Sequence, residues 1–245
     1  MTETSHPAVP AEFEVVDFMD ERVNMSHWFP VVDDLDVPTP TTKRLEIAPG
    51  TDEPIEWDNE AACELVESLG GTAFIRSGRS SGDGEHSQLI KSPDPLQVKR
   101  TIKALVVDHM MAQMKLGEAL WFREWLDLDH PVATEVRTYI RDGEVVCAHP
   151  RLDDLHRAKD KEAAYERTQA ALDADWESTL KPHAETVAAA MDGWWSLDFV
   201  QDTNGDWYCT DMALDAIYER DGQYIEMSWH PDDCENRLEP HCNHP

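Results

Sequence analysis

Apolar residues recur along this chain in two periods, one near 3.6 residues and the other of 2. The helical period is clearest over residues 58–69, where a cap at Asp58 or Asn59 and a stop at Gly70 and Gly71 bound the run. Further helices are expected over residues 26–35, 94–116, 155–180 and 182–192.

Short alternating or continuous apolar runs predict strands, because successive side chains of a strand point to opposite faces. Single strands are expected at residues 72–75, 119–122 and 224–228, and hairpins at residues 133–148 and 194–213. Residues 37–41 must be extended, since each proline in VPTPT excludes helix at its own position and disfavours it at the position before. This extended stretch is a natural entry into a new subdomain.

The hairpin at residues 194–213 turns at Asn204-Gly205. This dipeptide favours a two-residue turn, because both central residues must accept a positive φ. The register that follows from such a turn pairs Thr203 with Asp206, Val200 with Cys209, and Asp198 with Asp211.

Asp198 and Asp211 then share one face of the hairpin, with Cβ atoms roughly 5 Å apart. Two carboxylates so placed repel each other unless one is protonated or a cation lies between them. A divalent metal with oxygen ligands is the simplest arrangement that satisfies both. The alternative is a loop one residue longer, which places the two aspartates on opposite faces where each is solvated.

The hairpin at residues 133–148 turns at an Asp-Gly dipeptide, residues 142–143. Its register places Arg141 opposite Glu144, which is an ordinary cross-strand ion pair. Arg137 falls opposite an alanine in the same register. Arg137 therefore lacks a partner across this hairpin and is available to a ligand.

A Gly- and Ser-rich segment follows the strand at residues 72–75. It begins with the cation Arg76 and runs from Ser77 to Gly84. Backbone N–H groups, hydroxyls and a positive charge in one loop can surround a polyphosphate. The alternative is a plain flexible loop, and the nearby acids oppose phosphate binding at its far end. The segment matches neither the GxGxxG nor the GxxxxGK[ST] pattern, so Rossmann and P-loop folds receive no support.

The chain has 245 residues, enough for one large domain or two modest ones. Its formal net charge is −29, from 50 acidic against 21 basic residues. An acidic, lysine-poor surface spread along the whole chain resembles salt adaptation of the haloarchaeal kind. This charge argues against a nucleic-acid or anionic-membrane partner at low salt, although molar salt screens it.

No apolar run approaches the roughly 20 residues that a membrane-spanning helix needs, and the N-terminus lacks a signal pattern. A cytoplasmic location is therefore expected. The 5 cysteines do not form a disulfide framework, and their odd number leaves at least one free thiol. Cys63, Cys147 and Cys209 are expected to be small buried apolar residues.

The end of the chain is rich in soft metal ligands, namely His230, Cys234, His241, Cys242 and His244. Four of them can in principle close a tetrahedral zinc site. Their spacing matches no established zinc module, so a tail with ordinary side chains is the alternative interpretation.

In these motifs and their order, the chain resembles the ATP-grasp superfamily. More closely, it resembles the short, mostly uncharacterised ATP-grasp proteins of phages and prokaryotes. The matching stretches lie within residues 28–213 and are Trp28-Phe29-Pro30 with VPTPT, FIRSG with His86-Ser87, KSPDPL, FREWLDL, EVRTYIRDGEVVCAHP and WSLDFVQDTNGDWYCTDMA. A more distant similarity links it to the ATP-grasp proteins that help assemble a eukaryotic translation initiation factor.

The resemblance implies an α+β ATP-grasp fold, in which two α+β subdomains with antiparallel sheets clasp a nucleotide. The implied division is a flexible arm (1–12), a segment before the ATP-grasp domain (13–57), an N-subdomain with the phosphate loop (58–125), a C-subdomain with the metal site (126–229) and a tail (230–245).

The resemblance also implies roles for matching residues. Arg76 would contact the α- and β-phosphates of ATP, and Arg137 the γ-phosphate or the transferred phosphoryl group. Asp198 and Asp211 would bind Mg²⁺, or Mn²⁺ in its place. The other nucleotide contacts would come from Ser77, Gly78, Ser80, Ser81 and Gly82 in the phosphate loop, from Glu124, Trp125 and Leu126 at the adenine, and from Asp127 or Asp129 at the ribose.

One departure from the family pattern concerns the metal. The common pattern ends in acid-x-Asn, whereas this chain reads Asp211-Met212-Ala213 and so lacks the expected third oxygen ligand. Asp215 is close enough in sequence to substitute. The departure indicates a modified metal site.

The leading hypothesis is an ATP- and Mg²⁺-dependent ligase, which activates a small-molecule or peptide carboxylate as an acyl phosphate for attack by an amine or similar nucleophile. The second is a non-catalytic ATP-binding assembly or adaptor protein. A third, nucleotidyl transfer to RNA ends, predicts AMP in place of ADP and is opposed by the acidic surface.

Overall fold

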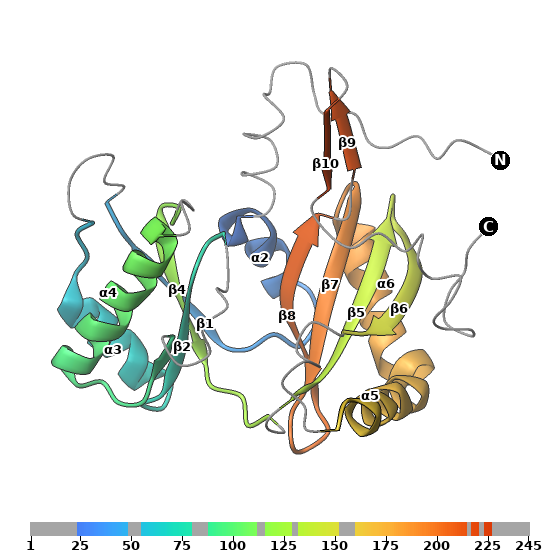
Figure 1. Cartoon of the computed structure of the whole chain (residues 1–245), viewed down its shortest axis with the longest axis horizontal. Coiled ribbons are helices and arrows are strands. Elements are labelled where there is room, and N and C mark those ends of the chain that lie inside the picture. Colours follow the sequence, from blue (N-terminus) through green and yellow to red (C-terminus); the bar gives the residue numbers. More distant parts are fainter. Residues whose placement is uncertain are drawn as a thin grey trace. The chain divides into compact units, whose positions relative to one another are not determined.

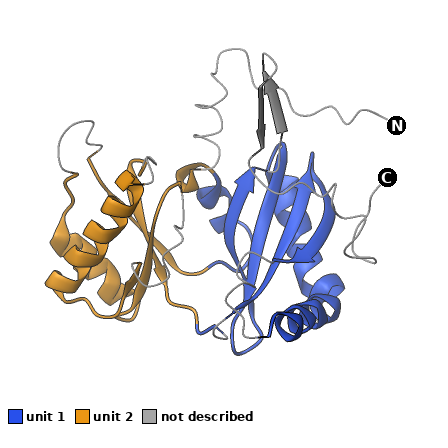
Figure 2. Ribbon diagram, viewed as in Figure 1, with its two compact units in different colours: residues 1–23, 28–39, 127–245 blue, residues 24–27, 40–126 orange. Residues whose placement is uncertain are grey.

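The computed structural model describes residues 24–48, 55–79, 88–111, 116–128, 132–151, 160–214, 217–220 and 223–226. The chain divides into two compact units, which differ in colour in Figure 2. Unit 2 contains residues 24–27 and 40–126, and unit 1 contains residues 28–39 and those from 127 onward. Each unit is built on its own sheet.

Unit 2 contains a four-stranded antiparallel sheet in the order β1-β4-β2-β3 (Figure 1). Its strands are β1 (Thr42–Glu46), β2 (Ala73–Ser77), β3 (Leu89–Ile90) and β4 (Ala119–Glu124). Two helices, α3 (Asn59–Ser68) and α4 (Pro95–Met111), pack on this sheet and on each other. The sequence predicted both helices and the strands β2 and β4, but it did not predict β1 or β3.

The ends of the two helices follow from their sequences. Asp58 caps α3 by accepting hydrogen bonds from the backbone N–H groups of Glu60 and Ala61, and Gly70 follows the helix with a φ of 86°. Asp94 accepts bonds from the N–H groups of residues 96 and 97 at the start of α4. Each cap satisfies N–H groups that have no partner within the helix.

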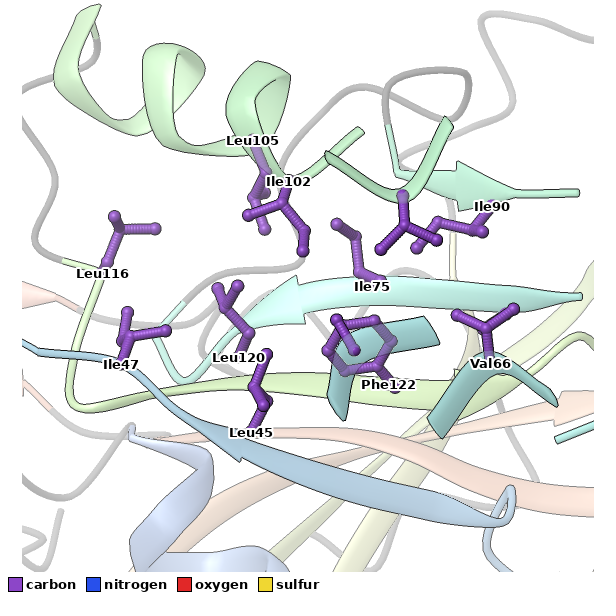
Figure 3. Packing of buried hydrophobic residues seen from close by; sticks show 13 residues of the cluster. Leu45, Ile47, Val66, Ile75, Ile90, Ile102, Leu105, Leu116, Leu120 and Phe122 are labelled. Atoms are coloured by element: carbon purple, nitrogen blue, oxygen red, sulfur yellow. The ribbon is translucent and has the colours of Figure 1, made fainter. Parts of the chain in front are cut away.

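The core of unit 2 lies between α4 and the sheet. Figure 3 shows Ile102 and Leu105 of α4 pointing toward Ile75 of β2 and toward Leu120 and Phe122 of β4. All five side chains are buried. Burial of such side chains contributes about 1.5–3 kcal/mol each to the stability of the unit.

Unit 1 contains a second four-stranded antiparallel sheet, in the order β6-β5-β7-β8. Its strands are β5 (Thr134–Arg141), β6 (Glu144–Pro150), β7 (Trp194–Gln201) and β8 (Trp207–Leu214). The helices α5 (Lys161–Asp175) and α6 (Lys181–Ala190) pack on β5 and β6 and are joined by a π-helical turn, Trp176–Leu180 (Figure 1). The helix α2 (Met25–Asp33) begins in unit 2 and ends in unit 1.

The β5–β6 hairpin turns at Asp142 and Gly143, with φ values of 50° and 89°, as the sequence predicted. Arg141 lies opposite Glu144, which confirms the register next to the turn. A bulge between Tyr139 and Ile140 then shifts the register. The expected pairing of Arg137 with Ala148 is therefore wrong, and Arg137 lies opposite His149.

The β7–β8 hairpin has a loop one residue longer than the predicted two-residue turn. The N–H of Gly205 donates to the carbonyl of Asp202 at 3.0 Å, and the N–H of Asp202 donates to the carbonyl of Asp206 at 2.9 Å. Gly205 has a φ of 92°. These bonds describe a three-residue loop with a left-handed glycine at its end. The expected pairings of Thr203 with Asp206 and of Val200 with Cys209 are wrong, because Val200 faces Tyr208.

A bulge in the same hairpin restores the register at the aspartates. Phe199 pairs with Cys209, but Asp198 pairs with Asp211, so that Thr210 is an extra residue in β8. The longer loop and the bulge each shift the register by one residue, and the two shifts cancel. The expected pairing of Asp198 with Asp211 is confirmed, although the loop expected to produce it is not the one present.

A separate two-stranded sheet pairs β9 (Ile217–Arg220) with β10 (Gln223–Glu226). The strand expected at residues 224–228 corresponds in part to β10. Within the described residues, no helix is both long enough and apolar enough to cross a membrane. The cytoplasmic location stays a prediction.

Candidate functional site

Two polar clusters, one in each unit, contain the arginines and aspartates that the sequence singled out for the phosphates and the metal. The cluster of unit 1 is centred on Asp198, whose exposed fraction is only 3%. Asp198 lies on β7 between Arg137 of β5 and Asp211 of β8, which are its partners on the two neighbouring strands. The antiparallel register of three adjacent strands thus places one cation and two carboxylates in a row.

Arg137 binds Asp198 through two parallel hydrogen bonds. Its Nε donates to Oδ1 at 2.7 Å, and its Nη2 donates to Oδ2 at 2.9 Å. Bidentate, charge-assisted pairs of this kind are among the strongest polar contacts in proteins. The expectation that Arg137 lacks a partner is wrong for this reason, since it was based only on the opposite strand of its own hairpin.

Arg151 and Glu135 complete the cluster. Nη1 of Arg151 donates to Oδ2 of Asp198 at 2.8 Å and to Oε1 of Glu135 at 2.6 Å. The backbone fixes this contact, because the N–H of Arg151 donates to the carbonyl of Glu135 at 2.8 Å just after β6 ends. Two guanidinium groups therefore neutralise two carboxylates in a largely buried place.

The buried charges alter the pKa values of their neighbours. Burial raises the pKa of the Glu135 carboxyl, Arg151 lowers it and Asp198 raises it, and the net result is a pKa of about 7. Burial alone would lower the pKa of Arg137, but the attraction and hydrogen bonds of Asp198 outweigh it and raise that pKa above its usual value. Arg137 is thus charged at every pH of interest, whereas Glu135 titrates near neutrality.

Asp198 and Asp211 are suited to hold a magnesium ion whose other ligands are phosphate oxygens and water. Asp198 and Asp211 are direct neighbours in the register, and both carry the oxygen ligands that Mg²⁺ prefers. Among the described residues, no group of three or more Asp, Glu, His or Cys side chains is suited to a metal. Mg²⁺ is commonly held by one or two carboxylates together with phosphate oxygens and water, so two are sufficient for that mode of binding.

The cluster of unit 2 lies where β2 ends. Arg76 is the last residue but one of β2 and is 3% exposed, and its Nε donates to the carbonyl of Ser77 at 3.4 Å. The Ser77 hydroxyl lies 2.8 Å from Nε2 of His109, a fully buried residue of α4. The same hydroxyl accepts a hydrogen bond from the N–H of Arg79 at 3.2 Å. The start of the expected phosphate loop is thus tied to α4.

A second anchor holds the next residue of this loop. The carbonyl of Gly78 accepts a hydrogen bond from the N–H of Met25 at 2.5 Å. A Cβ added at Gly78 would lie 2.4 Å from Oδ1 of Asn24. Asn24 in turn donates to Glu118 at 3.2 Å and accepts from the N–H of Ser26 at 3.0 Å. Only glycine fits at position 78 while Asn24 keeps these bonds.

Glu118 is the charged member of this anchor. Burial alone would raise the pKa of its carboxyl, but hydrogen bonds from Ser26 and Asn24 and the charge of Arg44 outweigh burial and lower it. Glu118 is therefore an anion at neutral pH and holds the start of α2 against β4.

The residues expected at the adenine and ribose lie at the end of β4 and beyond it. Glu124 accepts a hydrogen bond from the N–H of Thr41 at 2.9 Å, and Trp125 is 39% exposed. Leu126 is half-buried. Asp127 accepts a hydrogen bond from the hydroxyl of Thr203 at 3.0 Å, which ties it to the β7–β8 loop.

Several expected site residues lie outside the described part of the chain. They are Ser80, Ser81 and Gly82 of the phosphate loop, Asp129, Asp215, and the group His230, Cys234, His241, Cys242 and His244. The proposals made for them from the sequence therefore stay predictions.

Sequence reasoning missed three functional candidates, Glu135, His109 and Asn24. Glu135 and Arg137 are two residues apart and so share a face of β5, which is a signal that was present in the sequence. His109 was hidden within a helical pattern, where a buried histidine looks like any core residue. Asn24 had no signal, because its role depends on contacts with residues far away in the chain.

No family model matches the chain, and no curated protein matches it. Solved structures do. Cdc123 from Schizosaccharomyces pombe is 13% identical, with a TM-score of 0.52 over 80% of this chain and 84% of that chain. D-alanyl-alanine synthetase A from Vibrio cholerae is 12% identical, with a TM-score of 0.47 over 79% and 55%. A RimK domain ATP-grasp protein from Sphaerobacter thermophilus is 13% identical, with a TM-score of 0.45 over 80% and 60%.

These similarities concern the fold. The chain is an α+β protein with two antiparallel four-stranded sheets, and its fold is similar to that of Cdc123 over 80% of the chain. Because folds of this kind carry more than one function, the activity has to be argued from the residues of the two clusters.

Proposed function

We propose that this protein is an ATP- and Mg²⁺-dependent ligase, which activates a carboxylate as an acyl phosphate and transfers the acyl group to an amine or similar nucleophile. The observation that carries the proposal is the row Arg137–Asp198–Asp211 across three adjacent strands of an ATP-grasp-like fold. Phosphoryl transfer needs charge neutralised and atoms positioned, and this row supplies an anion-binding guanidinium beside two oxygen ligands.

Asp198 and Asp211 are the residues that would hold Mg²⁺, or Mn²⁺ in its place. When bound, the ion neutralises phosphate oxygens and polarises the phosphoryl group. Arg137 would contact the γ-phosphate, and its planar guanidinium suits two oxygens of a phosphate as well as two oxygens of a carboxylate. Ala213 offers no ligand, and Asp215, outside the described residues, is the proposed substitute.

The nucleotide side of the proposal rests on unit 2. Arg76 would contact the α- and β-phosphates, and the segment from Ser77 through Gly82 would surround them with backbone N–H groups and hydroxyls. The backbone of Glu124, Trp125 and Leu126 would bind adenine, with Asp127 or Asp129 at the ribose. Since Asp127 already accepts a bond from Thr203, ribose binding there has to replace or share that contact.

In the proposed reaction, a carboxylate oxygen of the substrate attacks the γ-phosphorus, the bond to the β,γ-bridging oxygen breaks, and ADP leaves. The amine nitrogen then attacks the acyl carbon, inorganic phosphate leaves, and the amine loses a proton. Among the described residues of unit 1, Arg137 and Arg151 would bind the carboxylate or the acyl phosphate. The substrate is proposed to be a small molecule or peptide with a carboxyl group.

Product analysis tests the proposal. The protein is incubated with ATP, Mg²⁺ and pools of carboxylic acids and amines, and ADP, AMP and phosphate are quantified. A ligase of this kind releases ADP and phosphate only when both the carboxylic acid and the amine are present. Release of AMP indicates nucleotidyl transfer, which contradicts the proposal. Asp198→Asn and Asp211→Asn should each abolish Mg²⁺-dependent ATP binding, and unchanged binding in both removes the site assignment.

A second candidate is a non-catalytic ATP-binding assembly or adaptor protein. The observation that favours it is the absence, among the described residues, of a third acidic ligand beside Asp198 and Asp211. The resemblance to proteins that assemble a translation initiation factor points the same way. Such a protein binds MgATP through the same residues but releases no ADP with any pool of acceptors.

A further inference from the structure

Asp198 is surrounded by more positive charge than one ion pair supplies. Its Oδ1 accepts one guanidinium N–H, and its Oδ2 accepts two, one from Arg137 and one from Arg151. A cation that binds Asp198 therefore meets two guanidinium groups within hydrogen-bond distance of its ligand. Like charges at such separations repel strongly in a buried place, so the metal and both arginines cannot keep all these contacts together.

The two arginines are not equally easy to displace. Arg137 holds Asp198 with two parallel bonds, whereas Arg151 holds it with one. The side chain of Arg151 is 26% exposed and that of Arg137 only 16%. Arg151 also keeps a second carboxylate, Glu135, when its bond to Asp198 is lost. Displacement of Arg151 from Oδ2 is therefore the easier exchange.

We propose that Arg151 is an exchangeable counter-cation of Asp198, which yields Oδ2 to a divalent metal ion and then binds an anionic group of the substrate. This inference rests on the proposed function, because it assumes a metal at Asp198. It adds a substrate-binding role for Arg151. It also explains why the site has a second arginine, although one arginine suffices to balance the charge of Asp198.

The exchange couples the metal to the anion. Without an anion, a metal at Asp198 has to separate Arg151 from its carboxylate and lie near two positive charges. With a phosphate or carboxylate present, the displaced guanidinium has a new partner, so both ligands bind more tightly together than apart. Coupling of this kind is reciprocal: the metal must strengthen anion binding by the factor by which the anion strengthens metal binding.

The test measures the binding of Mn²⁺ to the full chain without nucleotide. The electron paramagnetic resonance signal gives the concentration of the unbound ion. Arg151→Gln should bind Mn²⁺ about tenfold or more tightly than the unaltered protein, since one charge-assisted hydrogen bond no longer competes. Adding inorganic phosphate should tighten Mn²⁺ binding to the unaltered protein by about tenfold and to Arg151→Gln by less than about twofold.

Two further variants show whether a gain in Mn²⁺ affinity comes from the exchange at Asp198, from the loss of a positive charge in general or from a folding defect. Arg141→Gln removes the same charge from the same hairpin, where the guanidinium lies over the ring of Trp194, 4.4 Å from its centroid. It should change Mn²⁺ affinity by less than about twofold, because Arg141 is half-buried next to the turn, four residues along β5 from Arg137, and charges at such a distance are screened. The double variant Glu135→Gln/Arg151→Gln removes the Glu135 carboxylate together with its cation, and Arg137 still binds Asp198, so it should fold and show the same tightening.

Equal Mn²⁺ affinity in the unaltered protein and in both Arg151 variants overturns the exchange, as does an equal gain in Arg141→Gln. Asp198→Asn separates this failure from failure of the proposed function. If Asp198→Asn loses MgATP binding while the Arg151 variants leave Mn²⁺ affinity unchanged, only the exchange is wrong. If Asp198→Asn keeps both Mn²⁺ and MgATP, the metal assignment and the exchange are wrong together.

Discussion

The imidazole of His109 joins the hydroxyl of Ser77 to the backbone of α4. Its Nδ1 lies 2.9 Å from the carbonyl of Leu105, and its Nε2 lies 2.8 Å from Oγ of Ser77. A carbonyl only accepts, so the proton of the neutral ring is on Nδ1, and Nε2 accepts the hydroxyl proton of Ser77. Because Ser77 then accepts from the N–H of Arg79, a directional chain of hydrogen bonds leads from α4 to the segment after β2.

Replacing His109 with leucine should destabilise the protein. The substitution keeps an apolar side chain in a buried place but leaves the Ser77 hydroxyl without its acceptor, which costs about 1–3 kcal/mol. The free energy of unfolding in urea measures the loss. Ser77→Ala and the double variant complete a cycle, and the double variant should lose less than the sum of the two single variants. Additive losses contradict the contact.

The stability of the His109 contact should also depend on pH. Burial lowers the pKa of His109 below its usual value of 6.5. The unfolded chain therefore binds a proton near pH 6.5 that the folded protein does not yet bind, so the stability contributed by His109 is lost as the pH falls below that value. The difference in unfolding free energy between the unaltered protein and His109→Leu should shrink from pH 7.5 to pH 5.5. A constant difference would contradict this.

Gly78 should not tolerate a side chain. A Cβ at this position lies 2.4 Å from Oδ1 and 3.2 Å from Cγ of Asn24, and Asn24 is held by Glu118 and by the N–H of Ser26. Gly78→Ala should therefore cost about 1–3 kcal/mol of unfolding free energy through overpacking. Asn24→Ala removes the clashing atoms. The double variant should therefore lose less unfolding free energy than the sum of the losses of Gly78→Ala and Asn24→Ala. An unaffected Gly78→Ala would show that Asn24 moves without cost.

Local sequence signals predicted much of the fold. The Asp-Gly turn, the capped helix α3 and the buried runs of β2 and β4 are each determined by residues within a few positions of one another. β1 was not predicted, because only one of the five residues of TKRLE, Leu45, is buried. Its strand conformation depends on pairing with β4, more than 70 positions away in the chain.

The candidate site shows the limit of local reasoning more sharply. The pairing of Asp198 with Asp211 was predicted from a two-residue turn, but it results from a longer loop and a compensating bulge at Thr210. Periodicity gives no sign of a bulge, since an extra residue changes the register without changing the composition. The partners of Arg137 were missed because β5 pairs with β7 as well as with β6, and the order of strands is a property of the tertiary fold.

Glu135 should make the protein less stable as the pH rises. Burial raises the pKa of Glu135 from 4.5 to about 7 in the folded protein. Between these values the folded state holds a proton that the unfolded state has lost, so the contribution of Glu135 to stability falls with rising pH. Glu135→Gln removes this titration and keeps an oxygen for Arg151. From pH 4 to pH 8, its unfolding free energy should rise relative to the unaltered protein by up to about 3 kcal/mol. Parallel profiles would contradict the raised pKa.

Arg137 should matter for stability in a way that depends on Asp198. Replacing Arg137 with methionine keeps most of the apolar stem but removes two of the three guanidinium bonds to a carboxylate that is 3% exposed. Loss of one partner of a buried ion pair typically costs about 3–5 kcal/mol, chiefly because the other charge stays buried. Arg141→Met, on the same face of β5, is the matched control and should cost about 2 kcal/mol or less, the range for a half-buried cation–π contact.

The double variant Arg137→Met/Asp198→Asn decides whether the buried charge causes that loss. If it does, the neutral amide needs no second cation, and the double variant should be more stable in urea than Arg137→Met alone. A double variant that is less stable than either single variant would mean that Arg137 stabilises β5 through its stem, independently of Asp198. If the buried charge is the cause, Arg137 is the counter-cation that stays with Asp198, which leaves Arg151 as the one that a metal ion can displace.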